Sequence, residues 1–233
     1  CLDFMSAEIT PLESYPTLAA RIAVSSFFFY IVDLHPYFSH KGRSIPSMID
    51  LAQKNEVTRF VISSSGNAAL AAAKTIQQWN VAEPSNPLFL HIFVGEQVDE
   101  EKLSLLHTFE SDKITISQVE RPIVAAIKEQ KENDAYYLRQ STDDTALSGY
   151  AALATELCEI EEPFDLFIPT SSGTTAQALA QYFIENKKEI RVHVVQTTCC
   201  HPIATALGAT TDAQDVPSLA TAIVARVAHR KRA

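Results

Sequence analysis

From Lys41 onward, the sequence alternates between stretches of helical periodicity and short apolar stretches, with turns of a few residues between them. This alternation is typical of a parallel sheet whose strands are joined by crossover helices. Helices are predicted at 44–55, 68–79, 100–109, 122–129, 147–159, 176–186 and 219–230. Strands are predicted at 59–62, 88–94, 113–119, 135–138, 166–169 and 192–197. The sequence therefore predicts an α/β fold.

Two of the predicted strands, Arg59–Ile62 and Leu166–Ile168, are largely continuous apolar runs without polar alternation. Strands of this kind are buried on both faces, as in a parallel sheet covered by helices on each side. With 233 residues, the chain is long enough for one large domain or two small ones. An ordinary folded enzyme is the natural expectation from its composition.

The formal charge of the chain is -9, and its pI is near 5.2. Binding to a nucleic-acid backbone requires clustered Lys and Arg, so no nucleic-acid partner is expected. The one basic run is His229-Arg230-Lys231-Arg232, at the C-terminal end of the chain. Basic residues there are interpreted as a solvated helix end that complements the helix dipole, and no function is assigned to them.

No stretch reaches the roughly 18 to 20 consecutive apolar residues of a membrane span. The nearest, Ile22–Leu34, is interrupted by Ser25, Ser26 and Asp33. No signal-peptide pattern is present, so a cytoplasmic protein without a membrane partner is expected. Because the chain begins with Cys1 and not with Met, we expect a processed product or a fragment.

Four cysteines in a chain of this length do not form a disulfide framework, and reduced thiols are expected. Cys199, Cys200 and His201 are consecutive, with His193 nearby. Structural zinc sites space their ligands as C-x2-4-C and H-x3-5-H, which this segment does not do. We therefore expect no metal, and we interpret the segment as packing at the end of a strand.

Three polar loops carry the chemical information, and the first contains a lysine. Lys41 lies in Ser39-His40-Lys41-Gly42-Arg43, just before a predicted helix. Its amine can form a Schiff base with an aldehyde, and partial burial would lower its pKa and make it a proton carrier. Taken alone, a lysine of this kind is more often a solvated surface residue.

The second loop, Ser63-Ser64-Ser65-Gly66-Asn67, follows a predicted strand and opens an alanine-rich helix. Free N–H groups and the positive end of the helix dipole converge at such a place, which favours an anion such as a substrate carboxylate. Ser and Asn are also the usual capping residues of helices, so a simple N-cap is an equal alternative.

The third loop, Ser171-Ser172-Gly173-Thr174-Thr175, also lies between a predicted strand and a predicted helix. Small residues let a phosphate approach the backbone, and the four hydroxyls can donate to it. The motifs of nucleotide hydrolases, of dinucleotide-binding proteins and of α/β-hydrolases are absent. In this order, the three loops predict a single pyridoxal-phosphate (PLP) site.

These loops resemble those of the fold-type II PLP enzymes, the tryptophan synthase beta-like family. The Lys41 segment is similar to the family's S-F-K-x-R, with His40 at the aromatic position. Ser64–Ala68 resembles S-S-G-N-A/T, and Ser171–Thr175 resembles the phosphate loop G-T-G-G-T, with Ser171 and Thr174 replacing glycines.

Further segments narrow the resemblance. Thr10-Pro11-Leu12 is similar to a T-P-L segment near the start of these enzymes. Lys41–Arg43 and the helix from Gly149 to Glu156 are most similar to threonine synthase and its near relatives.

The resemblance implies a role for each loop. Lys41 would carry the cofactor as a Schiff base and act as acid and base, and Asn67 would bond its phenolic oxygen. Substrate contacts are implied for Ser64, Ser65, Gly66 and Asn67, and contacts to the cofactor phosphate for Ser171, Ser172, Gly173, Thr174 and Thr175.

The resemblance also implies two Rossmann-like lobes of three layers. Residues 1–43 and 160–233 would form the larger, PLP-phosphate-binding lobe, and residues 44–159 the smaller lobe that closes on the substrate. The family normally continues beyond a point like Ala233, so the larger lobe is expected to be incomplete. The absent part would hold the residue that faces the pyridine nitrogen. A homodimer is implied by family habit alone.

The implied function is that of a PLP-dependent lyase or synthase acting on a small amino acid. Threonine synthase, which converts O-phosphohomoserine and water to threonine and phosphate in amino-acid biosynthesis, is the first interpretation. The alternatives are a serine/threonine dehydratase, a cysteine synthase and a non-catalytic relative that binds PLP or an amino acid. An unrelated α/β binding domain would require all three loops to be coincidental helix caps.

Overall fold

The computed structural model describes residues 10–209, 218–220, 225 and 227–230. The chain divides into two compact units, Cys1–Tyr137 and Leu138–Ala233. Each unit contains a parallel sheet with crossover helices, so the predicted α/β class is confirmed. The lobes expected at 1–43 with 160–233 and at 44–159 stay a prediction.

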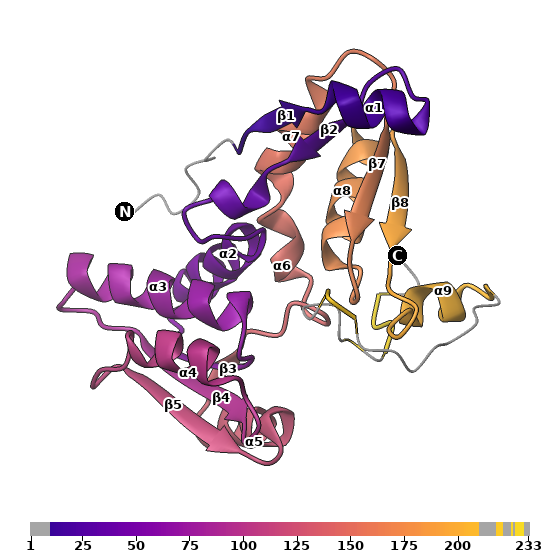
Figure 1. Ribbon diagram of the computed structural model, residues 1–233. Coiled ribbons are helices and arrows are strands. Elements are labelled where there is room, and N and C mark those ends of the chain that lie inside the picture. Colours follow the sequence, from indigo (N-terminus) through magenta and orange to yellow (C-terminus); the bar gives the residue numbers. More distant parts are fainter. Residues whose placement is uncertain (1–9, 210–217, 221–224, 226, 231–233) are drawn as a thin grey trace. The chain divides into compact units, whose positions relative to one another are not determined.

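The first unit is built on a four-stranded parallel sheet (Figure 1). Its strands follow the order β5-β4-β3-β6. Their bounds are Arg59–Ser63 for β3, Phe89–Gly95 for β4, Ile114–Val119 for β5 and Tyr136–Tyr137 for β6. In the register, Ile62 lies beside Ile92, which lies beside Ile116. Since neighbouring residues of parallel strands point to the same face, these isoleucines form one apolar row.

Helices cover both faces of this sheet. They are α2 (Lys41–Gln53), α3 (Asn67–Ala82), α4 (Glu100–His107) and α5 (Pro122–Glu132). Val61, Phe93 and Tyr137 on one face pack against Ala126 of α5. Phe60, Leu90 and Ile92 alternate with these residues and are buried on the opposite face, the side of α2 and α3 (Figure 1). This two-sided burial explains why the strands are continuous apolar runs.

An antiparallel hairpin precedes the sheet in this unit, and the sequence pattern did not predict it. It consists of β1 (Leu12–Ser14), the helix α1 (Pro16–Ile22) and β2 (Phe28–Tyr30), and the short 3-10 helix η1 (Val32–Leu34) follows it. Strands of three residues fall below the length at which periodicity is informative. Just before β1, buried Thr10 accepts a hydrogen bond from Nη2 of Arg43 at 3.1 Å, which ties Thr10 to α2.

The second unit contains a β-α-β element and smaller helices. Strand β7 (Asp165–Pro169) and strand β8 (Arg191–Val195) pair in parallel and are connected by α8 (Thr174–Glu185). The helices α6 (Thr145–Ser148) and α7 (Ala151–Cys158) pack against α8, and α9 (Pro202–Ala206) follows β8.

Two predicted helices differ from the structure. The stretch 147–159 is divided between α6 and α7, because the chain turns at Gly149 and Tyr150 and thereby buries the tyrosine ring. The helix predicted at 219–230 is wrong for the residues that are described there, 219, 220, 225 and 227–230, none of which is helical. Helical propensity is a weak prior, and the tertiary bonds of Arg230 described below override it.

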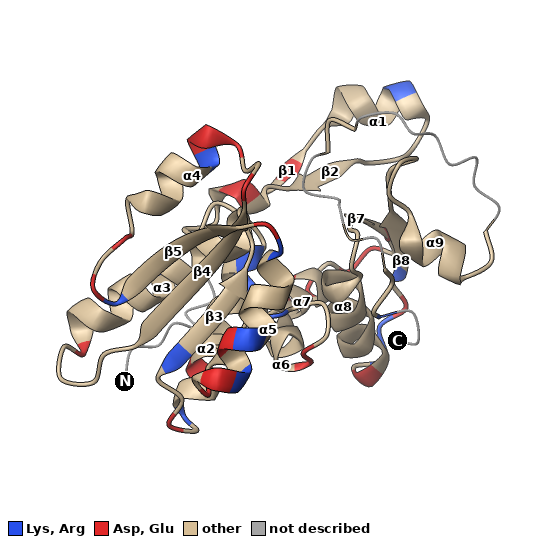
Figure 2. Cartoon of the chain, turned by 90° about the horizontal axis from the view of Figure 1, so that it is seen from below, with Lys and Arg blue, Asp and Glu red and all other residues tan. Residues whose placement is uncertain are grey.

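Charged residues are distributed over many elements. In Figure 2, Lys and Arg positions alternate with Asp and Glu positions along the helices and loops. Among the residues that the structure describes, no helix is long and apolar enough to cross a membrane.

The close packing at Gly42 gives a test of the fold. A methyl group at this position would collide with Cβ of Tyr37 and lie 2.6 Å from Nδ1 of His35. Because Cβ of Tyr37 is anchored to the backbone, Gly42→Ala should lower the free energy of unfolding by about 1–3 kcal/mol. Urea denaturation measures the change. Gly95→Ala is the control, since nothing lies within 4 Å of its added methyl group. Equal stability of the two variants would contradict the packing at Gly42.

Candidate functional site

Lys41 is the first residue of α2, and a local turn sets its position. The hydroxyl of Ser39, itself buried, accepts a hydrogen bond from the backbone N–H of Lys41 at 3.3 Å. Gly42 follows, and its missing side chain lets His35 and Tyr37 pack directly on the start of the helix. The side chain of Lys41 therefore extends from a closely packed turn and not from a free loop.

Burial governs the electrostatics of this turn. It lowers the pKa of the Lys41 amine to about 8. Burial, together with the positive charge of Lys41, lowers the pKa of His40 to about 3, so this imidazole is neutral. The pKa of His35 falls to about 4, again through burial first and then through the charges of Arg43 and Lys74. An amine with a pKa near 8 is far more often unprotonated at neutral pH than an exposed lysine.

The turn before Lys41 is attached to α3 by Lys74. Its Nζ donates a hydrogen bond to the carbonyl of Pro36 at 2.6 Å. The same ammonium group lies 5.2 Å from the ring centre of Tyr37 and 5.3 Å from that of Phe38, within the range of cation–π attraction. The Tyr37 hydroxyl donates to Oε1 of Gln78 at 3.0 Å. The lysine turn is thus held on the helix that the second loop opens.

The second loop connects β3 to α3 in this same unit. The hydroxyl of Ser64 accepts a hydrogen bond from the backbone N–H of Gly66 at 3.3 Å. Gly66 is the N-cap of α3 and provides no side-chain cap, and Asn67 is the exposed first residue of the helix. The interpretation of the loop as a side-chain N-cap therefore loses its support. A helix of 16 residues presents its positive end here, which suits a carboxylate.

The third loop connects β7 to α8 in the second unit. Gly173, the N-cap of α8, has a φ of 86°, a left-handed conformation that favours glycine. Its N–H donates to Oγ1 of Thr170 at 3.1 Å. The hydroxyls of Ser172 and Thr174 lie 3.1 Å apart, and Thr174 also donates to the carbonyl of Gln140 at 3.2 Å. The hydroxyls of Thr170, Ser172 and Thr174 thus fix the conformation of this loop.

Gln196 is a residue of this region that sequence reasoning missed. Its Nε2 donates to the carbonyls of Thr170 and Ser171 at 3.3 and 3.4 Å. Its Oε1 accepts hydrogen bonds from the backbone N–H groups of Ile203 and Ala204, both at 3.1 Å. Gln196 therefore ties the third loop to the start of α9. The one signal available in the sequence was a polar residue near the end of the strand predicted at 192–197.

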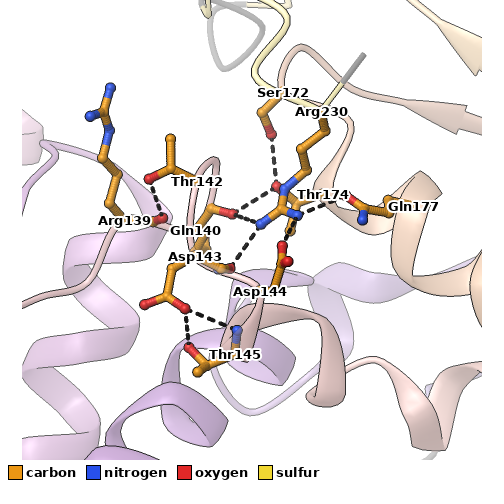
Figure 3. Close-up of polar contacts among 10 residues, drawn as sticks. All are labelled: Arg139, Gln140, Thr142, Asp143, Asp144, Thr145, Ser172, Thr174, Gln177 and Arg230. Atoms are coloured by element: carbon orange, nitrogen blue, oxygen red, sulfur yellow. Dashed lines mark hydrogen bonds and ion pairs between the residues drawn. The ribbon is translucent and has the colours of Figure 1, made fainter. Parts of the chain in front are cut away.

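Arg230 corrects the interpretation of the basic run at the C-terminal end of the chain. Its side chain is only 4% exposed, and it lies among residues of the same unit as the third loop (Figure 3). Nη1 donates to Asp144 at 2.8 Å and to Gln177 at 2.7 Å, and Nη2 donates to the carbonyls of Gln140 at 2.6 Å and Asp143 at 2.8 Å. The guanidinium is thus not a solvated helix end; Lys231 and Arg232 lie outside the described residues.

The structure thus brings the predicted site residues together in two groups. Lys41 and the loop from Ser64 to Asn67 belong to the first unit, on helices that pack against each other. The loop from Ser171 to Thr175 belongs to the second unit. An amine of lowered pKa, an uncapped helix start and a glycine-opened loop of hydroxyls are the groups that PLP requires. The residues fit this cofactor, and their individual roles stay predictions.

Within residues 10–209 and the described parts of the segment after them, no three His, Cys, Asp or Glu side chains are grouped so that they could hold a metal ion.

Comparison with protein families gives one match that spans nearly the whole chain. The model of a family described as "pyridoxal-phosphate dependent enzyme" matches residues 5–232. No curated protein matches the sequence.

Several solved structures share the fold. Processed threonine deaminase isoform 2 of Solanum lycopersicum is 18% identical, with a TM-score of 0.79 over 97% of this chain and 67% of the tomato chain. A fungal L-serine ammonia-lyase from Rhizomucor miehei is 18% identical, with a TM-score of 0.75 over 94% of this chain and 70% of the fungal one. Maize serine racemase is 20% identical, with a TM-score of 0.75 over 94% and 65% of the two chains.

The present chain spans about two thirds of the length of each of these relatives. Identities of this size show a common fold. The fold-type II assignment made from the three loops is confirmed at the level of the family, and with it PLP as the cofactor.

The lowered pKa of Lys41 gives a test that needs no substrate. Because the unprotonated amine is the reactive form, acetylation of Lys41 by a limiting reagent should rise with pH and reach half its maximum near pH 8. Exposed lysines, with a reference pKa of about 10.4, should continue to gain reactivity well above that pH. Peptide mass spectrometry follows each site separately. A Lys41 profile that coincides with that of the exposed lysines would contradict the desolvation of this amine.

Proposed function

Because the chain belongs to the family of pyridoxal-phosphate dependent enzymes, we propose that it is a lyase that removes ammonia from L-serine or L-threonine. Serine would give pyruvate and ammonia, and threonine would give 2-oxobutanoate and ammonia. The observation that carries this proposal is the desolvated Lys41 amine on a turn fixed to α3, the helix that begins at the Ser64–Asn67 loop.

Structural relatives favour ammonia removal over the threonine synthase interpretation. The tomato threonine deaminase and the fungal L-serine ammonia-lyase share the fold over at least 94% of this chain. The likeness to threonine synthase rested on the short segments Lys41–Arg43 and Gly149–Glu156. In the structure, the second segment starts with the turn at Gly149 and Tyr150, and its helix, α7, begins at Ala151. We therefore place threonine synthase second.

The chain's own residues account for substrate binding. We propose that the backbone N–H groups and hydroxyls of Ser64, Ser65 and Gly66 bind the substrate carboxylate at the positive end of α3. Asn67, exposed at the first position of this helix, has an amide that can orient the cofactor ring by a hydrogen bond. Binding through the carboxylate holds the α-carbon of the substrate in one orientation, which is the main contribution of a positioning loop.

Proton transfer is assigned to Lys41. When bound, PLP supplies an electron sink for the electrons left on the substrate's α-carbon. With a pKa near 8, Nζ of Lys41 can accept the proton from this carbon and return it to the departing hydroxyl group. The neutral imidazole of His40, with its pKa near 3, adds no second positive charge beside the lysine.

Covalent labelling tests the cofactor assignment. Incubation with PLP followed by borohydride reduction should attach one pyridoxyl group to the peptide that contains Lys41, as measured by mass spectrometry. Lys41→Ala should remove this adduct, and Lys128→Ala, a change at an exposed side chain of α5, should leave it. An adduct distributed over surface lysines in the wild-type protein would refute the assignment of Lys41.

A substrate panel tests the reaction. With L-serine and L-threonine, we expect release of ammonia and a 2-oxo acid, and Lys41→Ala should lower the rate by at least about a hundredfold. Release of phosphate from O-phosphohomoserine would instead support threonine synthase, and formation of D-serine without ammonia would indicate a racemase. PLP binding without turnover of any of these substrates would indicate that the chain is a non-catalytic relative of the family.

A further inference from the structure

Arg230 lies directly beside the third loop. A methyl group built on Gly173 would be 3.7 Å from Cβ of Arg230 and 3.2 Å from Cδ1 of Ile203. The arginine backbone therefore packs against the residue that caps α8. Since the segment that carries Arg230 is not helical at the described residues, its side-chain bonds hold this position.

The guanidinium extends along the first turn of α8. Thr174 is the first residue of this helix and Gln177 is the fourth. The carbonyl of Gln140 accepts from both Arg230 Nη2 and Thr174 Oγ1, while Gln177 accepts from Nη1 (Figure 3). A fixed positive charge is thus connected, through one shared carbonyl, to the hydroxyl that opens the helix.

This charge is in an electrostatically unfavourable place. The N-terminal end of a helix is the positive end of its dipole, so a cation there is repelled and an anion is attracted. The paired carboxylate, Asp144, is 80% exposed, and solvent screens its attraction. Nε of Arg230 is buried without a hydrogen-bond partner among the described residues. A buried donor that is left without an acceptor destabilises the folded protein.

A bound anion would remove both penalties. The anion would be attracted by the guanidinium and by the positive end of α8. It would also offer acceptor oxygens to Nε of Arg230, which has no acceptor among the described residues. We propose that Arg230 belongs to the phosphate site of this protein and supplies its fixed positive charge for the phosphate group of PLP. This inference rests on the proposed role of the loop from Ser171 to Thr175.

A comparison of the binding affinities of PLP and pyridoxal measures the contribution of the phosphate group. Pyridoxal has the same aldehyde and lacks the phosphate group, so the ratio of the two dissociation constants reports the phosphate contacts alone. We would measure both by absorbance titration for the wild-type protein, Arg230→Met and Arg191→Met. Arg191 is the matched control, because it lies in the same unit, pairs with Asp165 at 2.9 Å and is 81% exposed.

In Arg230→Met, affinity for PLP should fall by about tenfold or more, the loss typical of a hydrogen bond to a charged group, while affinity for pyridoxal should stay within about twofold. Arg191→Met should change neither. An equal loss for both ligands would show that Arg230 is only a structural tie and would overturn the inference, as would unchanged binding. A wild-type protein that binds no PLP would refute the cofactor role of the loops first, and the inference with it.

A second variant keeps the test decisive if Arg230→Met does not fold. Asp144→Asn removes the exposed carboxylate that competes for the guanidinium and preserves the shape of the side chain. Its affinity for inorganic phosphate, measured by calorimetry at low ionic strength, should rise by a few fold, because the positive charge is less neutralised. Unchanged or weaker phosphate binding would overturn the inference.

Discussion

The strands of both units pair in parallel, and this pairing sets where the connecting helices and loops lie. Because β3 runs parallel to both β4 and β6, each connection must return along a helix, and the strand ends come to one edge of the sheet. The loop from Ser64 to Asn67 begins where β3 ends, and the loop from Ser171 to Thr175 follows the end of β7. Each is followed by the positive end of a helix. The fold thus produces two anion-attracting loops, one in each unit, from a single architectural rule.

The reactivity of Lys41 depends on how closely its neighbours can pack. Gly42 lets His35 and Tyr37 lie against the start of α2, and Lys74 holds the preceding turn on α3. Desolvation then lowers the pKa of the lysine amine without any need for a neighbouring cation to do so. The site on the first unit is therefore a consequence of packing around a glycine, and its chemistry is inseparable from the stability of the turn.

Arg230 shows how one long side chain can change the electrostatics of a loop. The third loop has fewer glycines than the family pattern that it resembles, and its backbone is correspondingly less free. The hydroxyls of Ser172 and Thr174 are hydrogen-bonded to each other, and that of Thr174 donates to the Gln140 carbonyl. In the proposed phosphate site, a guanidinium that shares this carbonyl would attract the phosphate without depending on backbone freedom. The proposed site would thus hold the PLP phosphate through the loop hydroxyls and the Arg230 guanidinium, in place of the glycine backbone of the family pattern.

Hydrophobic periodicity and turn residues are local signals, so the α/β class, the approximate bounds of most helices and strands and the three loops could be predicted from the sequence alone. Only the tertiary structure decided the lowered pKa of Lys41, the role of Gln196 and the burial of Arg230, whose partners Gln140 and Gln177 are distant in sequence. The helix predicted at 219–230 is wrong at its described residues for the same reason. Burial and hydrogen bonding between distant residues outweigh local propensity, and no pattern along the chain records which distant residues meet.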